Sequence, residues 1–331
     1  MPKAFIKNIN QTVKKTTEQL GLKPKIPLKY FKQKEKRFFA TPCYSASWGN
    51  KKNEVIFFKM LISPEMKDSL SLKKEALLTE FLYKESRQDQ RITFPKFIAK
   101  NIAQYPFWLL REYLPGKIIG YHFKIYKSGL KINTRKKIVD TVLALQNIDY
   151  RKISGFILEK RTYQDYFAAL KKIENELKLW RKGKYQNEID FKKIFSFFEE
   201  QKKYFKQENL ALTHGDLTLA NFFLNKEGLF LTDWEWARLD NSAYDICRLW
   251  IQTFKYPNWR RSLLDDFLKT LPQNKKQAFK ESFRLIAVSE AISEFFGNLL
   301  RTQRKTNLKQ SMKQTINLSL KGFNQLINQK T

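Results

Sequence analysis

The residues best suited to chemistry lie in one short strip of the chain. The run His214-Gly215-Asp216 is followed by Asn221, and Asp233 comes twelve residues after that asparagine. Both acidic groups follow short apolar segments, where a loop can present them to a cleft. Transfer of a phosphoryl group needs a carboxylate near the acceptor hydroxyl and metal ions that neutralise the phosphates. The residue types and their spacing therefore indicate phosphoryl transfer.

Each polar residue of this strip suits one role. Asp216 can accept or orient the proton of the acceptor hydroxyl. Asn221 offers Mg²⁺ a neutral oxygen and Asp233 an anionic one, and Mg²⁺ prefers a few such hard oxygens beside water and substrate phosphates. We expect His214 to order the loop by hydrogen bonding rather than to act as a base. Alone, each residue would be typical of a turn or a cap, but the full set is rare by chance.

The same spacing occurs in the catalytic loop of protein kinases, and it directs attention to a lysine upstream. Lys59 follows an aromatic and β-branched run in a strand expected over residues 54–61, as the kinase lysine does. A helix that carries acids is expected next, over residues 69–86. Glu75 and Glu80 are both candidates to pair with Lys59 and hold it against the phosphates.

The elements that would position these residues form a small sheet followed by helices. Strands are expected at 36–40, 44–48, 54–61, 94–98 and 107–113, with a hairpin turn at 49–53. Leu114-Pro115-Gly116 then breaks the chain. Helices are expected at 132–148, 162–181, 190–206, 242–255, 260–270, 273–300 and 306–328. One strand pair, 222–224 with 229–232, interrupts them. The order predicts an α+β chain with a boundary near Gly116.

The charge is strongly positive, with 63 Lys and Arg against 32 Asp and Glu, a net of +31. Residues 1–36 contribute +8 and residues 301–331 contribute +7. Such an excess attracts nucleic acid, anionic lipid or a phosphorylated substrate. The charges are scattered, without an Arg-rich or aromatic-interleaved motif. A solvated basic surface is therefore favoured, nucleic acid is an unlikely partner, and a peripheral contact of the basic ends with an anionic membrane stays open.

The first segment, residues 4–20, is the part of the chain most suited to a membrane surface. Phe5, Ile9, Val13 and Leu20 lie near helical spacing with lysines between them. A basic amphipathic helix of this kind can lie on a bilayer. We favour the alternative that it packs on its own domain.

Composition excludes several other classes. Two cysteines, Cys43 and Cys247, are too few for a disulfide scaffold or a four-thiolate zinc site. Two histidines, His122 and His214, do not favour a histidine-built metal centre. We find no apolar run of membrane-spanning length and no signal-peptide pattern, so the expected location is the cytoplasm.

Taken together, these residues make the chain resemble the aminoglycoside phosphotransferase and choline kinase superfamily of small-molecule kinases. The catalytic strip of that family looks like His-Gly-Asp-x-x-x-x-Asn, then Asp-x-Glu or Asp-x-Asp, then Tyr-Asp. The matching positions here are His214-Gly215-Asp216, Asn221, Asp233-Trp234-Glu235 and Tyr244-Asp245. Lys74-Glu75-Ala76 is similar to the family's lysine-pairing helix, which favours Glu75 over Glu80. The resemblance spans residues 36–250.

The resemblance implies a protein-kinase-like fold of two lobes. A basic extension would cover residues 1–35. A small antiparallel sheet with one helix would form the ATP-binding lobe, residues 36–114. A larger, mainly α-helical lobe, residues 115–331, would carry the catalytic loop and the acceptor site.

The resemblance also implies a role for each site residue, with ATP and Mg²⁺ as cofactors. Adenine would lie against the hinge between the lobes and bond to the backbone of Glu112 and Leu114, and Lys59 with Glu75 would hold the phosphates.

The catalytic groups follow from the same likeness. Asp216 would be the catalytic base, and Asn221 and Asp233 the metal ligands. Glu235 would assist the metal or bind substrate, and Asp245 would hold the catalytic loop.

The chain departs from kinases in two respects. Gly49 is the only glycine from 22 to 115, so no glycine-rich loop is visible, and the phosphate-covering loop is expected near 40–44 with Ser45 beside it. Gly215 and the sequence Asp-Trp-Glu argue against a protein kinase. We therefore expect a small-molecule acceptor, such as a sugar, an amino alcohol or another metabolite.

The identity of the acceptor and the oligomeric state stay open. The net charge favours an anionic acceptor. An aminoglycoside would need local acids, for which Glu235 and Asp240 are candidates. Choline would need an aromatic cage, for which the candidates are Trp234, Trp236, Trp250 and Tyr244. The alternative from another class is a non-catalytic binder of nucleic acid or anionic membranes on a degenerate kinase fold.

Overall fold

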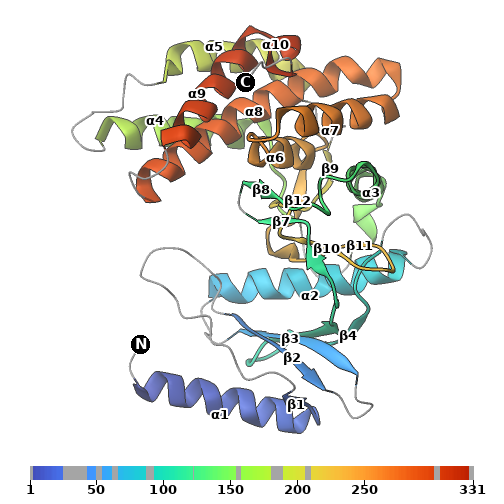
Figure 1. Ribbon diagram of the computed structural model, residues 1–331. Coiled ribbons are helices and arrows are strands. Elements are labelled where there is room, and N and C mark those ends of the chain that lie inside the picture. Colours follow the sequence, from blue (N-terminus) through green and yellow to red (C-terminus); the bar gives the residue numbers. More distant parts are fainter. Residues whose placement is uncertain are drawn as a thin grey trace. The chain divides into compact units, whose positions relative to one another are not determined.

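The computed structural model divides the chain into two compact units. It describes residues 3–24, 43–49, 54–61, 66–86, 93–121, 123–153, 158–179, 189–205, 210–301 and 306–327. The first unit comprises Met1–Lys117, Ile153–Phe156 and Asn221–Trp236, and the second comprises Ile118–Lys152, Ile157–Ala220 and Ala237–Thr331. The first is built on an antiparallel sheet and the second is mainly helical (Figure 1). The strand predicted at 36–40 and most of the loop predicted at 40–44 fall outside the described residues.

An antiparallel five-stranded sheet forms the centre of the first unit. Its order is β1 (Lys23–Pro24), β2 (Cys43–Gly49), β3 (Val55–Leu61), β5 (Trp108–Glu112) and β4 (Phe97–Asn101). Lys59 of β3 lies opposite Leu109 of β5. Successive residues of a strand point to opposite faces, so Lys59 shares its face with Leu61 and Leu109.

A helix covers each face of this sheet (Figure 1). The α1 helix (Lys3–Gln19) places Val13 in a core with Ile56 and Phe58 of β3. The α2 helix (Met66–Ser86) places Leu72 and Ala76 against the opposite face, which carries Leu61 and Leu109. Val13 of the first helix is therefore packed on its own domain, which agrees with the alternative that the sequence favoured.

A hairpin from much later in the chain completes the first unit. Strand β10 (Phe222–Leu224) pairs with β11 (Leu229–Leu231), as the sequence predicts. The side chain of Asn225 accepts the backbone N–H groups of Glu227 and Gly228 and so closes the turn. The short helix η6 (Trp234–Trp236) follows and packs against α2.

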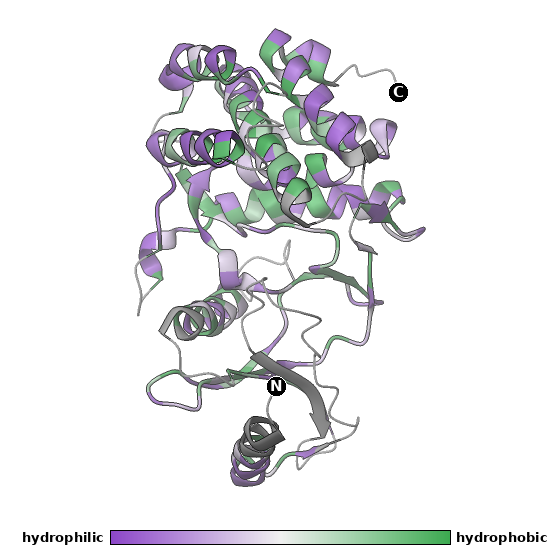
Figure 2. Ribbon diagram, turned by 90° about the vertical axis from the view of Figure 1, so that its left-hand side faces the viewer, coloured by the Kyte–Doolittle hydropathy of each residue, from purple (hydrophilic) through white to green (hydrophobic). Residues whose placement is uncertain are grey.

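The second unit is organised around one long helix, α8 (Gln273–Arg301). Every residue from 281 to 292 is buried, because other helices pack around this stretch (Figure 2). The helices in contact with α8 are α4 (Tyr163–Leu179), α5 (Phe191–Gln201), η4 (Lys202–Tyr204), α6 (Tyr244–Gln252), α9 (Thr306–Lys321) and α10 (Phe323–Ile327). The other helices are α3 (Ile132–Gln146), η1 (Tyr150–Lys152) and α7 (Pro257–Thr270).

Short strands of the second unit were not predicted. Strand β9 (Leu210–Thr213) pairs with β12 (Arg238–Asn241), and β7 (Gly120–Tyr121) pairs with β8 (Lys124–Ile125). A further strand, β6 (Lys117–Ile118), lies at the boundary of the two units. The single helix predicted over 306–328 was also wrong, because Gly322, with φ of 152°, separates α9 from α10. The strands that were not predicted have only two to four residues each, which is too short for a periodic pattern in the sequence.

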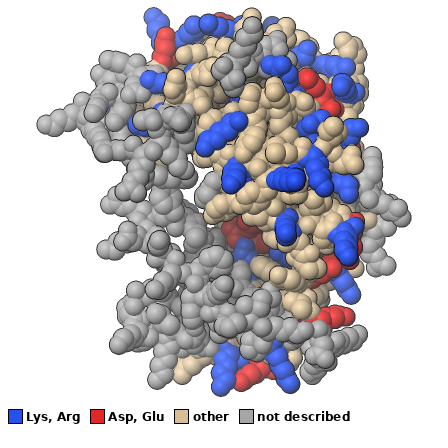
Figure 3. Space-filling view, in the orientation of Figure 1, with Lys and Arg blue, Asp and Glu red and all other residues tan. Residues whose placement is uncertain are grey.

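Basic side chains are interspersed with neutral ones on the face that Figure 3 shows. This distribution agrees with a solvated basic surface. None of the described helices is both long and apolar enough to cross a membrane.

Candidate active site

Lys59 lies at the centre of three carboxylates in the first unit. Its Nζ is 2.6 Å from Oε2 of Glu75, 2.5 Å from Oε1 of Glu235 and 3.3 Å from Oδ1 of Asp233. Lys59 and Glu75 are buried, with 8% and 2% of their surface exposed. Buried charges are stable only when they are paired, and here one ammonium group holds three acids together.

The pairing of Lys59 with Glu75 follows from the packing of α2 on the sheet. Lys59 points to the face that α2 covers, and Glu75 is a buried position of that helix. Glu80, the other candidate, bonds to Lys84 and Lys100 instead. The structure thus has the pairing that the sequence favoured, and Glu80 belongs to a separate, more exposed ion pair.

Lys59, Glu75, Asp233 and Glu235 form what we call the Lys59 cluster, and burial has the largest effect on the pKa of its Glu75. Burial raises the pKa of Glu75 to about 7, the charge of Lys59 opposes that rise, and Asp233 and Glu235 add to it. Three acids against one lysine leave the cluster negative when all are ionised. Such a cluster gains stability from a further cation.

Asp233 is the member of this cluster that can face a cation. Its side chain is 47% exposed, and its backbone has a φ of 75°, which is rare outside glycine. The N–H of Thr232 donates to the carbonyl of Asn221 at 3.1 Å, so the β10–β11 hairpin brings Asn221 next to the strand end that leads into Asp233. One oxygen each of Glu75, Asp233 and Glu235 lies within 4.8 Å of the others. Hard oxygen donors of this kind fit Mg²⁺.

The segment expected to bind adenine lies at the end of β5. The N–H of Glu112 donates to the carbonyl of Lys96 at 2.8 Å, and the carbonyl of Glu112 accepts from Nη1 of Arg111 at 3.0 Å. Leu114 is buried. Arg111 lies over the ring of Phe57, 3.9 Å from its centre, and burial lowers the pKa of Arg111 to about 10. The carbonyl of Glu112 retains a second lone pair, whereas its N–H already has a partner.

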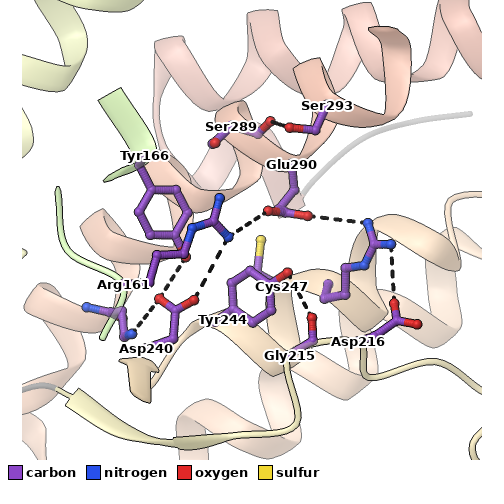
Figure 4. A network of polar contacts seen from close by, with 12 residues as sticks. Arg161, Tyr166, Gly215, Asp216, Asp240, Tyr244, Cys247, Ser289, Glu290 and Ser293 are labelled. Carbon is purple, nitrogen blue, oxygen red and sulfur yellow. Dashed lines mark hydrogen bonds and ion pairs between the residues drawn. The ribbon is translucent and has the colours of Figure 1, made fainter. Parts of the chain in front are cut away.

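The loop predicted to be catalytic, which begins at His214, belongs to the second unit and is held by α6. Gly215, with φ of 79°, turns the chain after β9. Asp245 accepts the backbone N–H groups of His214 at 2.8 Å and Gly215 at 3.3 Å. The hydroxyl of Tyr244 donates to the carbonyl of Gly215 (Figure 4). Burial raises the pKa of Asp245 to about 6, and these N–H groups together with His214 oppose the rise.

Asp216 follows this hydrogen-bonded turn, and its side chain reaches the surface. Its side chain is 38% exposed, whereas His214 is fully buried. Nη2 of Arg248 lies 3.4 Å from Oδ1 of Asp216. Sequence reasoning did not select Arg248, although its place three residues after Asp245 put it on the same face of α6.

Asp240 and most of the aromatic candidates do not form an acceptor site. Asp240 is fully buried and bonds to Tyr166 and Arg238. The buried aromatic candidates are Trp234, Trp250 and Tyr244. Trp236 is 55% exposed. The suggestion that Asp240 binds an aminoglycoside was therefore wrong, because its side chain is buried and already bonded. Trp234, Trp250 and Tyr244 are used in packing and do not line a choline cage.

Comparison with known proteins gives one family. The model described as "Phosphotransferase enzyme family" matches residues 88–276, more than half of the chain. An aminoglycoside 3′-phosphotransferase of Acinetobacter baumannii is 25% identical over 206 residues, which are 60% of this chain and 72% of that protein.

Solved structures share the fold at low sequence identity. The GDP and kanamycin complex of APH(2″)-IIIa has a TM-score of 0.57 and 13% identity, covering 86% of this chain and 92% of that one. The amicoumacin kinase hAmiN, in complex with AMP-PNP, Ca²⁺ and Ami, has a TM-score of 0.56 and 13% identity, covering 98% and 100%. The predicted kinase-like α+β fold, with an N-terminal antiparallel sheet and a mainly helical remainder, is thereby confirmed.

Proposed function

The chain belongs to the phosphotransferase enzyme family, and from this we propose that it transfers the γ-phosphate of ATP to a hydroxyl group of a small molecule, with Mg²⁺ as its metal cofactor. The observation that carries the proposal is the catalytic loop. Asp216 is an exposed carboxylate on a turn whose backbone is fixed by Asp245. A general base needs this combination of access to substrate and a fixed position.

The first unit would bind the nucleotide. Lys59 is a buried ammonium group held by Glu75, so it offers a fixed positive charge to the phosphates. The backbone at Glu112 and Leu114 would meet the base. GTP is tested beside ATP, because the APH(2″)-IIIa complex holds GDP.

The metal would be held by Asp233 and Asn221, with Glu235 in support. When bound, it supplies positive charge against the phosphate oxygens. Asp233 is half exposed and anionic, and the hairpin places Asn221 close to it. Glu235 contributes through Lys59, which it contacts directly.

Asp216 would act on the acceptor. The proton of the acceptor hydroxyl passes to its carboxylate as the oxygen bonds to the γ-phosphorus and the bond to the leaving diphosphate breaks. His214 is buried and would order the loop.

The acceptor has two candidate classes. The net charge of +31 supports an anionic hydroxyl compound, such as a phosphorylated sugar. A polycation such as an aminoglycoside is supported by the similarity to an aminoglycoside 3′-phosphotransferase of Acinetobacter baumannii. Kanamycin is bound in the APH(2″)-IIIa structure.

The test combines a screen with one substitution. Consumption of Mg·ATP and Mg·GTP is measured with aminoglycosides, sugar phosphates, sugars and amino alcohols. Asp216→Asn should abolish turnover while nucleotide affinity stays within about threefold, because the amide cannot take the proton. Asp140→Asn, an exposed aspartate of α3, is the control and should match the wild type. Turnover by Asp216→Asn at the wild-type rate would reject the assignment.

The non-catalytic alternative makes a different prediction. It requires steeply salt-dependent binding to nucleic acid or anionic vesicles and no stabilisation by Mg·ATP. A thermal-shift titration with Mg·ATP separates the two, since only the kinase is stabilised.

A further inference from the structure

Two residues on one face of α6 contact the catalytic loop, one at its backbone and one at a side chain. Asp245 bonds to the backbone of His214 and Gly215. Arg248, three residues later, contacts the side chain of Asp216, and this contact is the dashed line at the labelled Asp216 in Figure 4. Residues three apart on a helix lie on the same face. The first contact fixes the path of the loop, and the second acts on the carboxylate itself.

The other edge of the Arg248 guanidinium is fixed by α8. Its Nη1 lies 2.7 Å from Oε1 of Glu294 and 3.3 Å from Oε2 of Glu290. The two glutamates are four residues apart and so share one face of α8. The second oxygen of Glu290 accepts from Nη1 of Arg161 at 3.3 Å, which holds that carboxylate from the opposite side (Figure 4).

The cluster keeps Arg248 charged and immobile. Its side chain is 18% exposed. Burial disfavours its charge, but the carboxylates of Glu294 and Glu290 outweigh burial and raise the pKa of Arg248 above its usual range. A guanidinium group is planar, with donors on separate nitrogens. One nitrogen can therefore stay on the α8 glutamates while another reaches Asp216.

We propose that Arg248 is a positioning residue that fixes the carboxylate of Asp216 for the acceptor hydroxyl. This proposal rests on the proposed function, which makes Asp216 the proton acceptor. The bond from Nη2 to Oδ1 limits the rotation of the Asp216 carboxylate. Glu290 and Glu294 hold the arginine and through it the base.

A purely structural ion pair would have a different effect. It would stabilise the contact of α6 with α8 without a specific influence on turnover. The substitution that separates the two roles is Arg248→Lys. The ammonium can still pair with Glu290 and Glu294, but as a single point charge it cannot also engage Asp216 through a second nitrogen.

The experiment measures hydrolysis of Mg·ATP by water, as release of inorganic phosphate, for the wild type, Arg248→Lys, Asp216→Asn and the double variant. The control is Arg135→Lys, which alters an ion pair of similar burial with Asp266, between α3 and α7. Melting temperature and the KM for Mg·ATP are measured for every variant.

We expect Arg248→Lys to lower kcat by about 10- to 100-fold, the order of loss that a misplaced catalytic group causes. Its KM should stay within about twofold, and its melting temperature should match that of Arg135→Lys, which retains full activity. Asp216→Asn should leave a residual hydrolysis by water that is about 100- to 10,000-fold slower. In that background Arg248→Lys should cause no further loss, because it acts through a carboxylate that is gone.

Each contrary outcome has a distinct meaning. A wild-type kcat for Arg248→Lys, or an equal fractional loss with and without Asp216, would overturn the role of Arg248 and leave the proposed function intact. Wild-type hydrolysis by Asp216→Asn would overturn the assignment of Asp216. A wild type that consumes no Mg·ATP or Mg·GTP, either with water alone or with any compound of the acceptor screen, would overturn the proposed function itself and this inference with it.

Discussion

Nζ of Lys59 and Oε1 of Glu235 lie 2.5 Å apart, which ties the second acid of the Asp-Trp-Glu sequence to the lysine of β3. The contact joins residues 176 positions apart in the sequence. Together with Glu75 and Asp233, it makes Lys59 the cation that compensates three acids.

Removing that cation should turn the cluster into a site for divalent ions. Lys59→Met leaves three carboxylates without their ammonium partner and should lower the free energy of unfolding by about 3–5 kcal/mol. Millimolar Mg²⁺ or Ca²⁺ should then raise the melting temperature of the variant more than that of the wild type, because the ion replaces the lost charge. Thermal unfolding with and without the ions measures this.

Lys100→Met is the matched control, since Lys100 pairs with Glu80 on the same α2 helix. It should respond to divalent ions as the wild type does. An equal response of all three proteins would show that the acids of the Lys59 cluster do not act together.

The catalytic loop should be sensitive to the size of residue 120. A Cβ at Gly120 would lie 2.5 Å from the carbonyl oxygen of Lys124 and 2.8 Å from a methyl group of Leu219, which belongs to the catalytic loop. Gly120→Ala must therefore displace the loop, and kcat should fall by at least about tenfold. Steady-state kinetics with Mg·ATP measure the loss.

Gly297→Ala serves as the comparison, because a Cβ there meets nothing within 4 Å and the residue lies inside α8. Alanine is the better helix former, so this change should stabilise the protein by about 0.5–1 kcal/mol and leave kcat unchanged. Equal kinetics for both variants would mean that the loop tolerates displacement.

Asp245 should make stability depend on pH. Its pKa rises on folding from 3.8 to about 6 because of burial. A carboxyl group with a raised pKa contributes stability below its unfolded pKa, and that contribution is lost as the pH rises through the folded value. Asp245→Asn carries no such charge. The free energy of unfolding of Asp245→Asn, relative to that of the wild type, should therefore rise by about 2.5 kcal/mol between pH 4 and pH 8.

Urea denaturation at both pH values measures this difference. Asp140→Asn, on the surface of α3, should show a constant difference from the wild type at both. A difference for Asp245→Asn that shrank toward pH 8 would contradict the buried, raised-pKa carboxyl.

The N-terminal helix should contribute to the stability of the sheet. Val13 is 1% exposed and contacts the core of Ile56 and Phe58. Val13→Ala should lower the free energy of unfolding by about 1–3 kcal/mol, whereas Lys15→Ala, on the exposed side of α1, should have no measurable effect. The midpoint of urea denaturation measures both. Equal midpoints would mean that α1 does not pack on the sheet.

Local pattern was enough to predict the elements with strong signals. The aromatic and β-branched run before Lys59 predicted β3, and the apolar runs 222–224 and 229–232 predicted the hairpin of β10 and β11. The preference for Glu75 over Glu80 came from a family likeness, and packing of α2 accounts for it, because only Glu75 lies on the buried face of that helix.

The interactions that sequence reasoning missed are those between distant segments. In the sequence Asp240 cannot be distinguished from a surface acid, because the Tyr166 hydroxyl that donates to it lies 74 positions away. Glu290 and Glu294 lie 42 and 46 positions from Arg248, so no local pattern relates them to the catalytic loop. Gly322 did carry a local signal, since glycine favours the end of a helix, but the apolar spacing on either side obscured it.

The discontinuous first unit has a consequence for how the protein is made. Its sheet and α2 are complete by residue 117, but Asn221–Trp236 belongs to the same unit and supplies two of the acids around Lys59. During translation the lysine and Glu75 leave the ribosome long before those partners exist. The small unit therefore reaches its final form only after the first two segments of the helical unit, Ile118–Lys152 and Ile157–Ala220, have been synthesised. A gene fragment that stops at residue 117 would encode an incomplete domain.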